Sequence, residues 1–181
     1  YACVPGKLWS DSNDRGLYKT TDGGKTWAKV LAGGNASTGC SSVSMDPANP
    51  DVLLAGLWDF RRKGWTFRSG GEGPSAASGS GLYKTTDGGK TWSLILKGSN
   101  LSTGCSGLTM DPRNPDRLFA GLWDFRRKGW EFRSGGNGPT APSGSGLFLT
   151  SDGGKTWQTL DSTTAKGLPP APWGRLAIEI A

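Results

Sequence analysis

The residues best suited to contact a ligand lie in two long inserts that are rich in cations and aromatic rings. The first insert covers 59–79 and reads DFRRKGWTFRSGGEGPSAASG, and a near-copy of it begins at Asp124. The core of each insert carries four basic and two acidic residues, a net charge of +2. Aromatic rings and arginines together suit a glycan or an acidic partner, through stacking and charge-assisted hydrogen bonds. The candidate binding residues are Arg61, Arg62, Trp65, Phe67, Arg68, Arg126, Arg127, Trp130, Phe132 and Arg133.

Two other roles for the inserts are open from the sequence. Their aromatic residues can pack the insert onto the domain, while the arginines pair with Asp59 or cap carbonyl groups. Interleaved basic and aromatic residues also suit nucleic acid. Because the positive charge is local and the chain reads as extracytoplasmic, we expect a glycan or an acidic protein rather than nucleic acid.

A second pattern, Ser/Thr-x-Asp-x-Gly-x-Thr-Trp, occurs three times. Asp22, Asp87 and Asp152 stand 65 residues apart in both steps. The Asp can accept hydrogen bonds from its own turn, the glycines allow a positive φ, and the Trp is expected to bury against the sheet. We therefore predict structural hairpin turns rather than catalytic or metal-binding carboxylates. Their residues are Thr20, Asp22, Gly24, Thr26, Trp27, Thr85, Asp87, Gly89, Thr91, Trp92, Thr150, Asp152, Gly154, Thr156 and Trp157.

This pattern resembles the Asp-box, or BNR repeat, of sialidases, sortilin-type (VPS10) receptors, xyloglucanase-like glycosidases and photosystem II assembly factors. The chain around it resembles bacterial secreted proteins of the sortilin-like or glycosyl-hydrolase-like BNR type, over nearly all of its length. The resemblance implies a β-propeller. It is weak evidence for function, because one fold carries unrelated activities.

The carboxylates outside these turns offer no evident catalytic pair. Glycoside hydrolysis needs two carboxylates about 5–10 Å apart across a cleft. Asp59 and Asp124 are repeat equivalents, whereas a single active site breaks repeat symmetry. Glu72 and Glu131 do break it, but drift in a loop explains that equally well. The other candidates are Asp11, Asp14, Asp161 and Glu179.

The residues needed for His-based catalysis, for His metal sites and for a Tyr nucleophile are also missing or have no clear candidate. The sequence has no His, which excludes His-based general-base catalysis and His metal ligands. A sialidase-like Tyr nucleophile has no clear candidate: the tyrosines are Tyr1, Tyr18 and Tyr83, and the last two are repeat-equivalent strand residues. We predict no catalytic residue, no metal site and no cofactor, and the chain reads more as a binding protein than as an enzyme.

The three cysteines are Cys3, Cys40 and Cys105. No CxxC pair occurs, which argues against a zinc site. Cys40 and Cys105 occupy equivalent repeat positions, and Cys3 has no such twin. One disulfide with one leftover thiol is compatible with this count, which by itself leaves the redox compartment open.

The repeats define an all-β fold. Residues 16–80 and 81–145 share 49 of 65 positions, and 146–181 form a partial third copy. Each full copy predicts four strands, A (Ser41–Met45), B (Val52–Trp58), C (Gly81–Thr85) and D (Thr91–Leu96), which make one propeller blade. The expected order is BCD, ABCD, ABCD, A, with the last strand over Gly174–Ala181. Strand alternation places the inserts and the D-to-A loops on one face and the Asp-box and A-to-B turns on the other.

Three blades do not close a ring, because propellers have four to eight. We therefore expect the chain, 1–181, to be a fragment of a larger propeller, completed by the same parent protein or by another copy. The predicted function is non-catalytic binding or scaffolding through the inserts, in a secreted or periplasmic bacterial protein. Two alternatives are a fragment of a BNR-repeat glycoside hydrolase and an accessory subunit of a membrane-associated complex. The sequence shows no membrane span.

Overall fold

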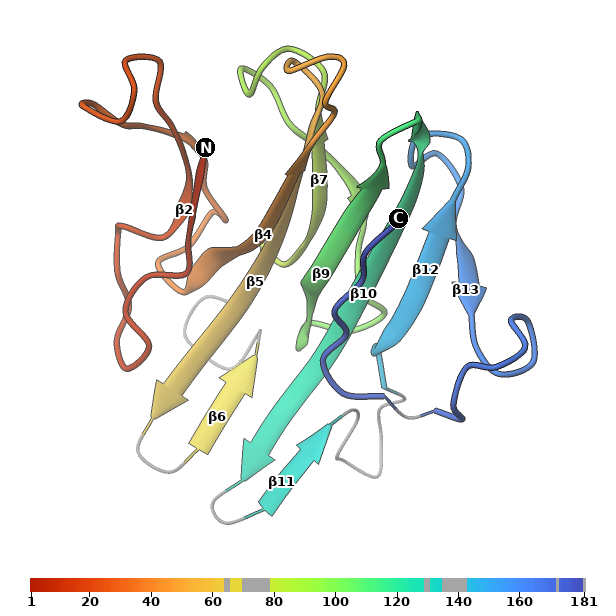
Figure 1. Ribbon diagram of the computed structural model, residues 1–181. Helices are drawn as coiled ribbons and strands as arrows, with labels where there is room; N and C mark the ends of the chain where they lie inside the picture. The colour runs from red at the N-terminus through yellow and green to blue at the C-terminus, as the bar shows by residue number, and fades with distance from the viewer. Residues whose placement is uncertain (64–65, 70–78, 129–130, 135–142, 172, 181) are drawn as a thin grey trace.

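The computed structural model describes residues 1–63, 66–69, 79–128, 131–134, 143–171 and 173–180, and within 61–69 and 126–134 it describes the backbone alone. Three antiparallel blades stand side by side in an open arc (Figure 1). The first blade is a separate three-stranded sheet, and the other two are parts of one ten-stranded sheet. The first blade contains β1 (Ala2–Val4), β2 (Gly16–Lys19) and β3 (Ala28–Leu31). The second contains β4 (Thr38–Met45), β5 (Leu53–Lys63), β7 (Gly81–Thr85) and β8 (Ser93–Leu96). The third contains β9 (Thr103–Asp111), β10 (Asn114–Lys128), β12 (Gly146–Thr150) and β13 (Gln158–Leu160).

The predicted partial propeller is confirmed in fold class and strand order. The pairings β1–β2–β3, β4–β5–β7–β8 and β9–β10–β12–β13 are the expected BCD, ABCD and ABCD. No helix occurs in the described part of the chain, so none there could span a membrane.

Two boundaries differ from the prediction. Strand B does not end at Trp58: β5 continues to Lys63 and β10 to Lys128, so the first part of each insert is strand rather than loop. Both strands continue because each insert supplies its own partner, β6 (Thr66–Ser69) or β11 (Glu131–Ser134). The predicted last strand is not formed over 173–180. The segment nevertheless lies against the third blade, because a Cβ added at Gly107 would be 2.6 Å from Leu176 O and one added at Gly121 would be 2.9 Å from Leu176 Cβ.

The hydrophobic core lies between neighbouring blades. One cluster joins the first two blades through Leu17, Leu31, Cys40, Ala55 and Leu57. The next joins the second and third blades, and its buried members are Leu54, Leu82, Cys105, Met110, Leu118, Ala120 and Leu122. Blades therefore stabilise one another face to face, as stacked repeats do.

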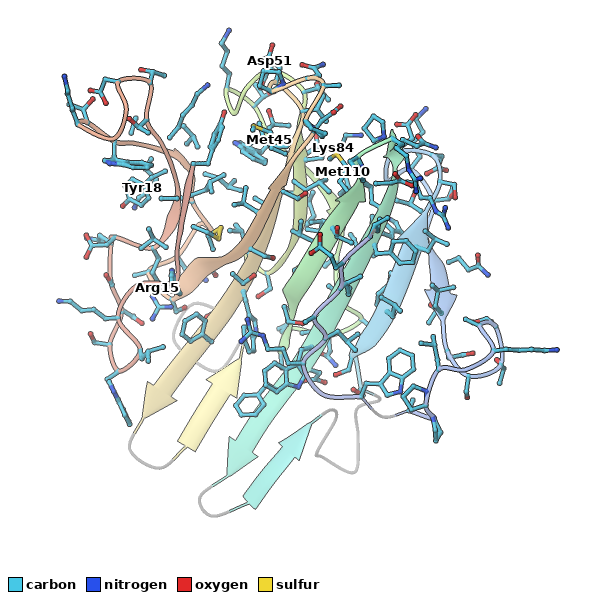
Figure 2. All side chains as sticks on the ribbon, in the orientation of Figure 1. Arg15, Tyr18, Met45, Asp51, Lys84 and Met110 are labelled. Atoms are coloured by element: carbon cyan, nitrogen blue, oxygen red, sulfur yellow. A yellow bond between two sulfur atoms is a disulfide. The ribbon has the colours of Figure 1, made fainter. Side chains whose placement is uncertain are left out.

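Lysines add a polar connection between blades at one end of the core. Lys19 Nζ donates to Gly88 O at 2.9 Å, and the equivalent Lys84 Nζ donates to Gly153 O at 3.0 Å. Figure 2 shows Lys84 at the same end of the molecule as Asp51. Each acceptor belongs to the Asp-box turn of the next blade. The same turns also receive the A-to-B turns, because Gly88 N donates to Asp51 O at 3.0 Å. This confirms that Asp-box and A-to-B turns share one face.

Candidate functional site

The Asp-box carboxylates are occupied by their own turns. Thr26 donates to Asp22 twice, from N to Oδ1 at 2.9 Å and from Oγ1 to Oδ2 at 2.6 Å. Thr20 Oγ1 donates to Asp22 Oδ1 at 2.8 Å. These bonds, the Thr26 hydroxyl first, lower the pKa of Asp22 to about 2, and equivalent bonds lower the pKa of Asp87 and Asp152. A carboxylate held ionised by its own turn is a poor general acid.

The three Asp-box tryptophans differ in burial. Trp157 packs against the core between the second and third blades, and its Nε1 donates to Ile95 O at 2.9 Å. Trp92 packs in the same way onto the cluster between the first and second blades. Trp27 is instead 46% exposed, so its predicted burial is wrong. Trp92 and Trp157 each pack against the preceding blade, and the described residues place no such blade against Trp27.

The candidate binding residues lie mainly on two hairpins at the opposite face (Figure 1). The first hairpin pairs β5 with β6, with Phe60 opposite Ser69 and Lys63 opposite Thr66. The second pairs β10 with β11 in the equivalent register, from Phe125 and Ser134 to Lys128 and Glu131. Trp65 and Trp130 lie outside the described residues.

The two hairpins are joined edge to edge. β6 pairs with β10, with Arg68 opposite Arg126 and Phe67 opposite Arg127. The backbone therefore forms a continuous antiparallel sheet, β5–β6–β10–β11, across two blades. We call this sheet the insert sheet.

The register of the insert sheet sorts its candidate residues into two rows. One row crosses all four strands and consists of Arg61, Arg68, Arg126 and Arg133. The adjacent row consists of Arg62, Phe67, Arg127 and Phe132. Positions opposite one another share a face of a sheet and successive positions alternate. The first row is therefore purely cationic, and the second alternates cations with aromatic rings.

Aromatic packing supports the base of the insert sheet. The ring centroids of Trp58 and Trp123 are 5.4 Å apart, and Phe60 and Phe125 lie 5.6 Å from Trp58 and 4.6 Å from Trp123 respectively. Arg15 covers this cluster, with its guanidinium carbon 4.6 Å from the Phe60 ring centroid. Arg15 Nη1 also donates to Ser37 O at 2.9 Å, which ties the first blade to the base of the hairpin.

Gly104 shows how closely Trp58 sits on the next blade. A Cβ at Gly104 would lie 1.9 Å from Trp58 Cδ1, so a larger residue has no room there. The indole of the second blade therefore lies directly on strand β9 of the third.

Two buried carboxylates fix the D-to-A loops beneath the insert sheet. Asp59 and Asp124 are 2% and 0% exposed. Asn35 Nδ2 donates to Asp59 Oδ2 at 3.2 Å, and Asn100 Nδ2 donates to Asp124 Oδ2 at 2.9 Å. The contacts confirm that inserts and D-to-A loops share a face. Because they repeat in two blades, both carboxylates hold structure.

Two of the other candidate carboxylates, Asp14 and Asp161, accept local hydrogen bonds. Asp14 accepts from Ser12 Oγ at 3.0 Å. Asp161 accepts from the Thr163 hydroxyl at 2.6 Å, and that bond is the main reason that its pKa falls to about 2. Glu72 lies outside the described residues. No group of three or more His, Cys, Asp or Glu able to hold a metal occurs where the structure is described.

Cys3 and Cys40 form a disulfide between the first and second blades, and Cys105 is a buried free thiol. Burial raises the pKa of Cys105 to about 12, so the thiol stays protonated in the folded chain at neutral pH. Between the second and third blades the position of Cys3 is taken by Gly56, whose added Cβ would lie 2.8 Å from Cys105 Sγ.

Sequence reasoning missed the residues that position the insert sheet. Arg15 carried no signal, because it lies in a polar loop without a repeat. The hairpins did have a signal in the sequence. Similar residues lie on both sides of a central glycine, in Phe-Arg-Arg-Lys-Gly-Trp and the following Phe-Arg-Ser, and a glycine between two strands is typical of a hairpin. The junction of β6 with β10 depends on how blades pack and has no local signature.

Comparisons with known proteins find Asp-box repeats and glycoside hydrolases. The BNR/Asp-box repeat family matches residues 18–29 and 83–94. A sialidase of Bacteroides fragilis (strain YCH46) is 25% identical over 175 residues, which are 80% of this chain and 28% of the sialidase. A probable oligoxyloglucan-reducing end-specific xyloglucanase of Neosartorya fischeri is 31% identical over 94 residues, which are 50% of this chain and 9% of that protein.

A solved structure agrees with the fold. A GH74 enzyme from Niastella koreensis superposes with a TM-score of 0.51 at 23% identity, over 83% of this chain and 18% of that one. The chain carries BNR/Asp-box repeats on a partial β-propeller, and it spans less than a third of each of these relatives. The likeness to sortilin-type receptors stays a prediction.

Proposed function

We propose that this chain is a segment of a BNR-repeat propeller of the glycoside-hydrolase type, in which the insert sheet forms a wall that binds glycan. The observation that carries the proposal is the pairing of β6 with β10. It turns the inserts of two blades into one continuous surface on the face opposite the Asp-box turns. A surface that spans blades can hold several sugar units of one chain.

The composition of this surface suits carbohydrate. Aromatic residues present flat apolar faces, and arginines supply donors for hydroxyl and acidic groups. The relatives named above are a sialidase and a probable xyloglucanase, which supports glycan as the ligand class. The disulfide between Cys3 and Cys40 supports an extracytoplasmic site, where such bonds persist.

We assign the chain to binding, and any catalytic carboxylates to the rest of the parent propeller. Asp59 and Asp124 are buried against Asn35 and Asn100, and the Asp-box carboxylates are held in their turns. None of these groups is available to protonate a leaving group. The insert sheet then positions a substrate that reacts elsewhere.

The test is binding to a panel of soluble polysaccharides, including xyloglucan, by the protein that carries this chain. Trp65→Ala combined with Trp130→Ala is expected to weaken glycan binding about tenfold or more, because each lost ring removes stacking area. Met45→Ala is the control, since Met45 is 46% exposed and ends strand β4 beside the A-to-B turn, on the opposite face. Glycan binding that survives the double substitution, or that falls equally with Met45→Ala, contradicts the proposal.

A further inference from the structure

We infer that the insert sheet binds a linear acidic glycan running across its strands, along the register positions of Arg61, Arg68, Arg126 and Arg133. This inference rests on the proposed function and names its ligand class. It starts from the backbone register, which places the four arginine positions opposite one another on four consecutive strands. We call them the arginine row.

The spacing of the arginine row suits a polymer rather than a single anion. Neighbouring strands lie about 4.8 Å apart, so four strands extend about 14 Å. A lone carboxylate or phosphate is bound by donors that converge, whereas the arginine row is a line of evenly spaced positions. An extended polyanion can meet such a line of cationic positions at several points along its length, whereas a small anion meets only one or two of them.

The charge of the row also calls for an anionic ligand. Like charges directly opposite one another destabilise a sheet, and here the arrangement is repeated at each strand pair. The same face carries Lys63 and Lys128 two positions further on, by strand alternation. The acidic positions next to the row are Asp59, Asp124 and Glu131, and the first two are buried with Asn partners. Cations therefore outnumber acidic residues on this face by six to three.

The duplication explains how the row arose and why it is linear. Arg61 and Arg68 are repeated as Arg126 and Arg133, one blade further along. Each hairpin adds two arginines to the row, so the row lengthens with the number of blades that carry the insert. Growth by equal steps matches a ligand that is itself a repeating chain.

The experiment compares polygalacturonate with its fully methyl-esterified form, which keeps the sugars and removes the charge. Arg68→Gln with Arg126→Gln is expected to weaken polygalacturonate binding about 100-fold, because each lost charge-assisted contact costs about tenfold. The slope of log affinity against log salt concentration should fall by about 1 to 2. The variant should also match or exceed the parent in thermal stability without ligand, since two like charges have left the row.

Two control pairs remove the same charge elsewhere. Arg62→Gln with Arg127→Gln changes the adjacent row of the same strands, and is expected to weaken binding less than about fivefold. Arg113→Gln with Arg117→Gln lies just before and within the far end of β10, and is expected to leave binding unchanged. Dextran sulfate tests whether the acidic group must be a carboxylate or can be a sulfate. Binding of either polymer that depends on the arginine row supports the inference.

Four results would overturn the inference. Equal losses of polygalacturonate affinity in the variants of the two rows would mean that the overall positive charge of the sheet attracts the ligand, with no preference for the arginine row. Equal binding of acid and ester would leave a glycan wall without charge recognition, so the proposed function would survive alone. A row variant that unfolds at lower temperature would mean that the arginines stabilise the fold. Binding of a single-stranded DNA oligonucleotide with no glycan bound would overturn both proposals.

Discussion

The carboxylate of Asp22 has a structural role in the Asp-box turn. Asp22 accepts from the hydroxyls of Thr20 and Thr26 and from the Thr26 backbone, in a turn whose glycines Gly23 and Gly24 have φ of 73° and 89°. Each of these partners stabilises the ionised carboxylate, so the same hydrogen bonds fix the turn and keep its Asp negatively charged. The same bonds at Asp87 and Asp152 explain why the octapeptide occurs three times with almost no change.

This geometry predicts a pH dependence for the turns. Since the folded-state pKa of Asp22 is about 2, below the usual 3.8, ionisation favours the folded state above about pH 4. That contribution is lost as the pH falls from about 4 through about 2. Thr26→Val removes the hydroxyl donor and should move the pKa of Asp22 up towards 3.8, as measured by carboxyl carbon-13 NMR. An unchanged titration in Thr26→Val would show that the hydroxyl is not the main cause.

At the scale of elements, the sequence defined the blades better than their junctions. Alternation and the Asp-box spacing predicted strands such as Gly81–Thr85, because local patterns set a half-buried strand. Trp58 looked like a strand end because charged residues follow it, yet β5 continues five residues further. Whether a charged segment pairs depends on a partner strand, here β6, and such pairing is not encoded in local hydrophobicity.

The disulfide illustrates the same limit. Cys40 and Cys105 are equivalent in the repeat, and the sequence left the pairing of the three cysteines open. The actual partner of Cys40 is Cys3, because a strand B residue of one blade faces strand A of the next. At the next junction the residue facing Cys105 is Gly56.

Gly56→Cys is therefore predicted to form a second disulfide with Cys105. The added Cβ would lie 2.8 Å from Cys105 Sγ, and the other close atoms are the hydroxyl ends of Ser41 and Ser42, which can rotate. Linking residues 49 apart should stabilise the chain by about 3 kcal/mol. The measurement is thermal unfolding with and without reductant, together with titration of free thiols.

The control for that variant is Gly121→Cys, the same repeat position at the third blade. Leu176 rather than a cysteine faces it, with Cβ atoms 2.9 Å apart. This variant should gain a free thiol and no stability. A free thiol count that does not fall in Gly56→Cys would mean that the second and third blades are spaced differently from the first two.

At the scale of the whole molecule, the outer side of the first blade is equivalent to surfaces that are interfaces between blades elsewhere in the arc. Trp92 and Trp157 pack on the blade before them, but Trp27 stays 46% exposed on the first blade. A propeller arc is stable in water only when its outer blades are covered, because each blade buries its apolar face on a neighbour. We expect another blade to cover Trp27, either in the parent chain or in a second copy.

The 181-residue chain alone should therefore associate through this side. Light scattering is expected to give a mass above 19.0 kDa that rises with protein concentration. Trp27→Glu places a charge where the preceding blade would pack and should shift the species towards the monomer. Trp9→Glu is the matched control, because Trp9 is 58% exposed but lies outside the Asp-box turn. A chain that is monomeric at all concentrations would show that the first blade needs no cover, and the glycan wall would then have to act with two hairpins alone.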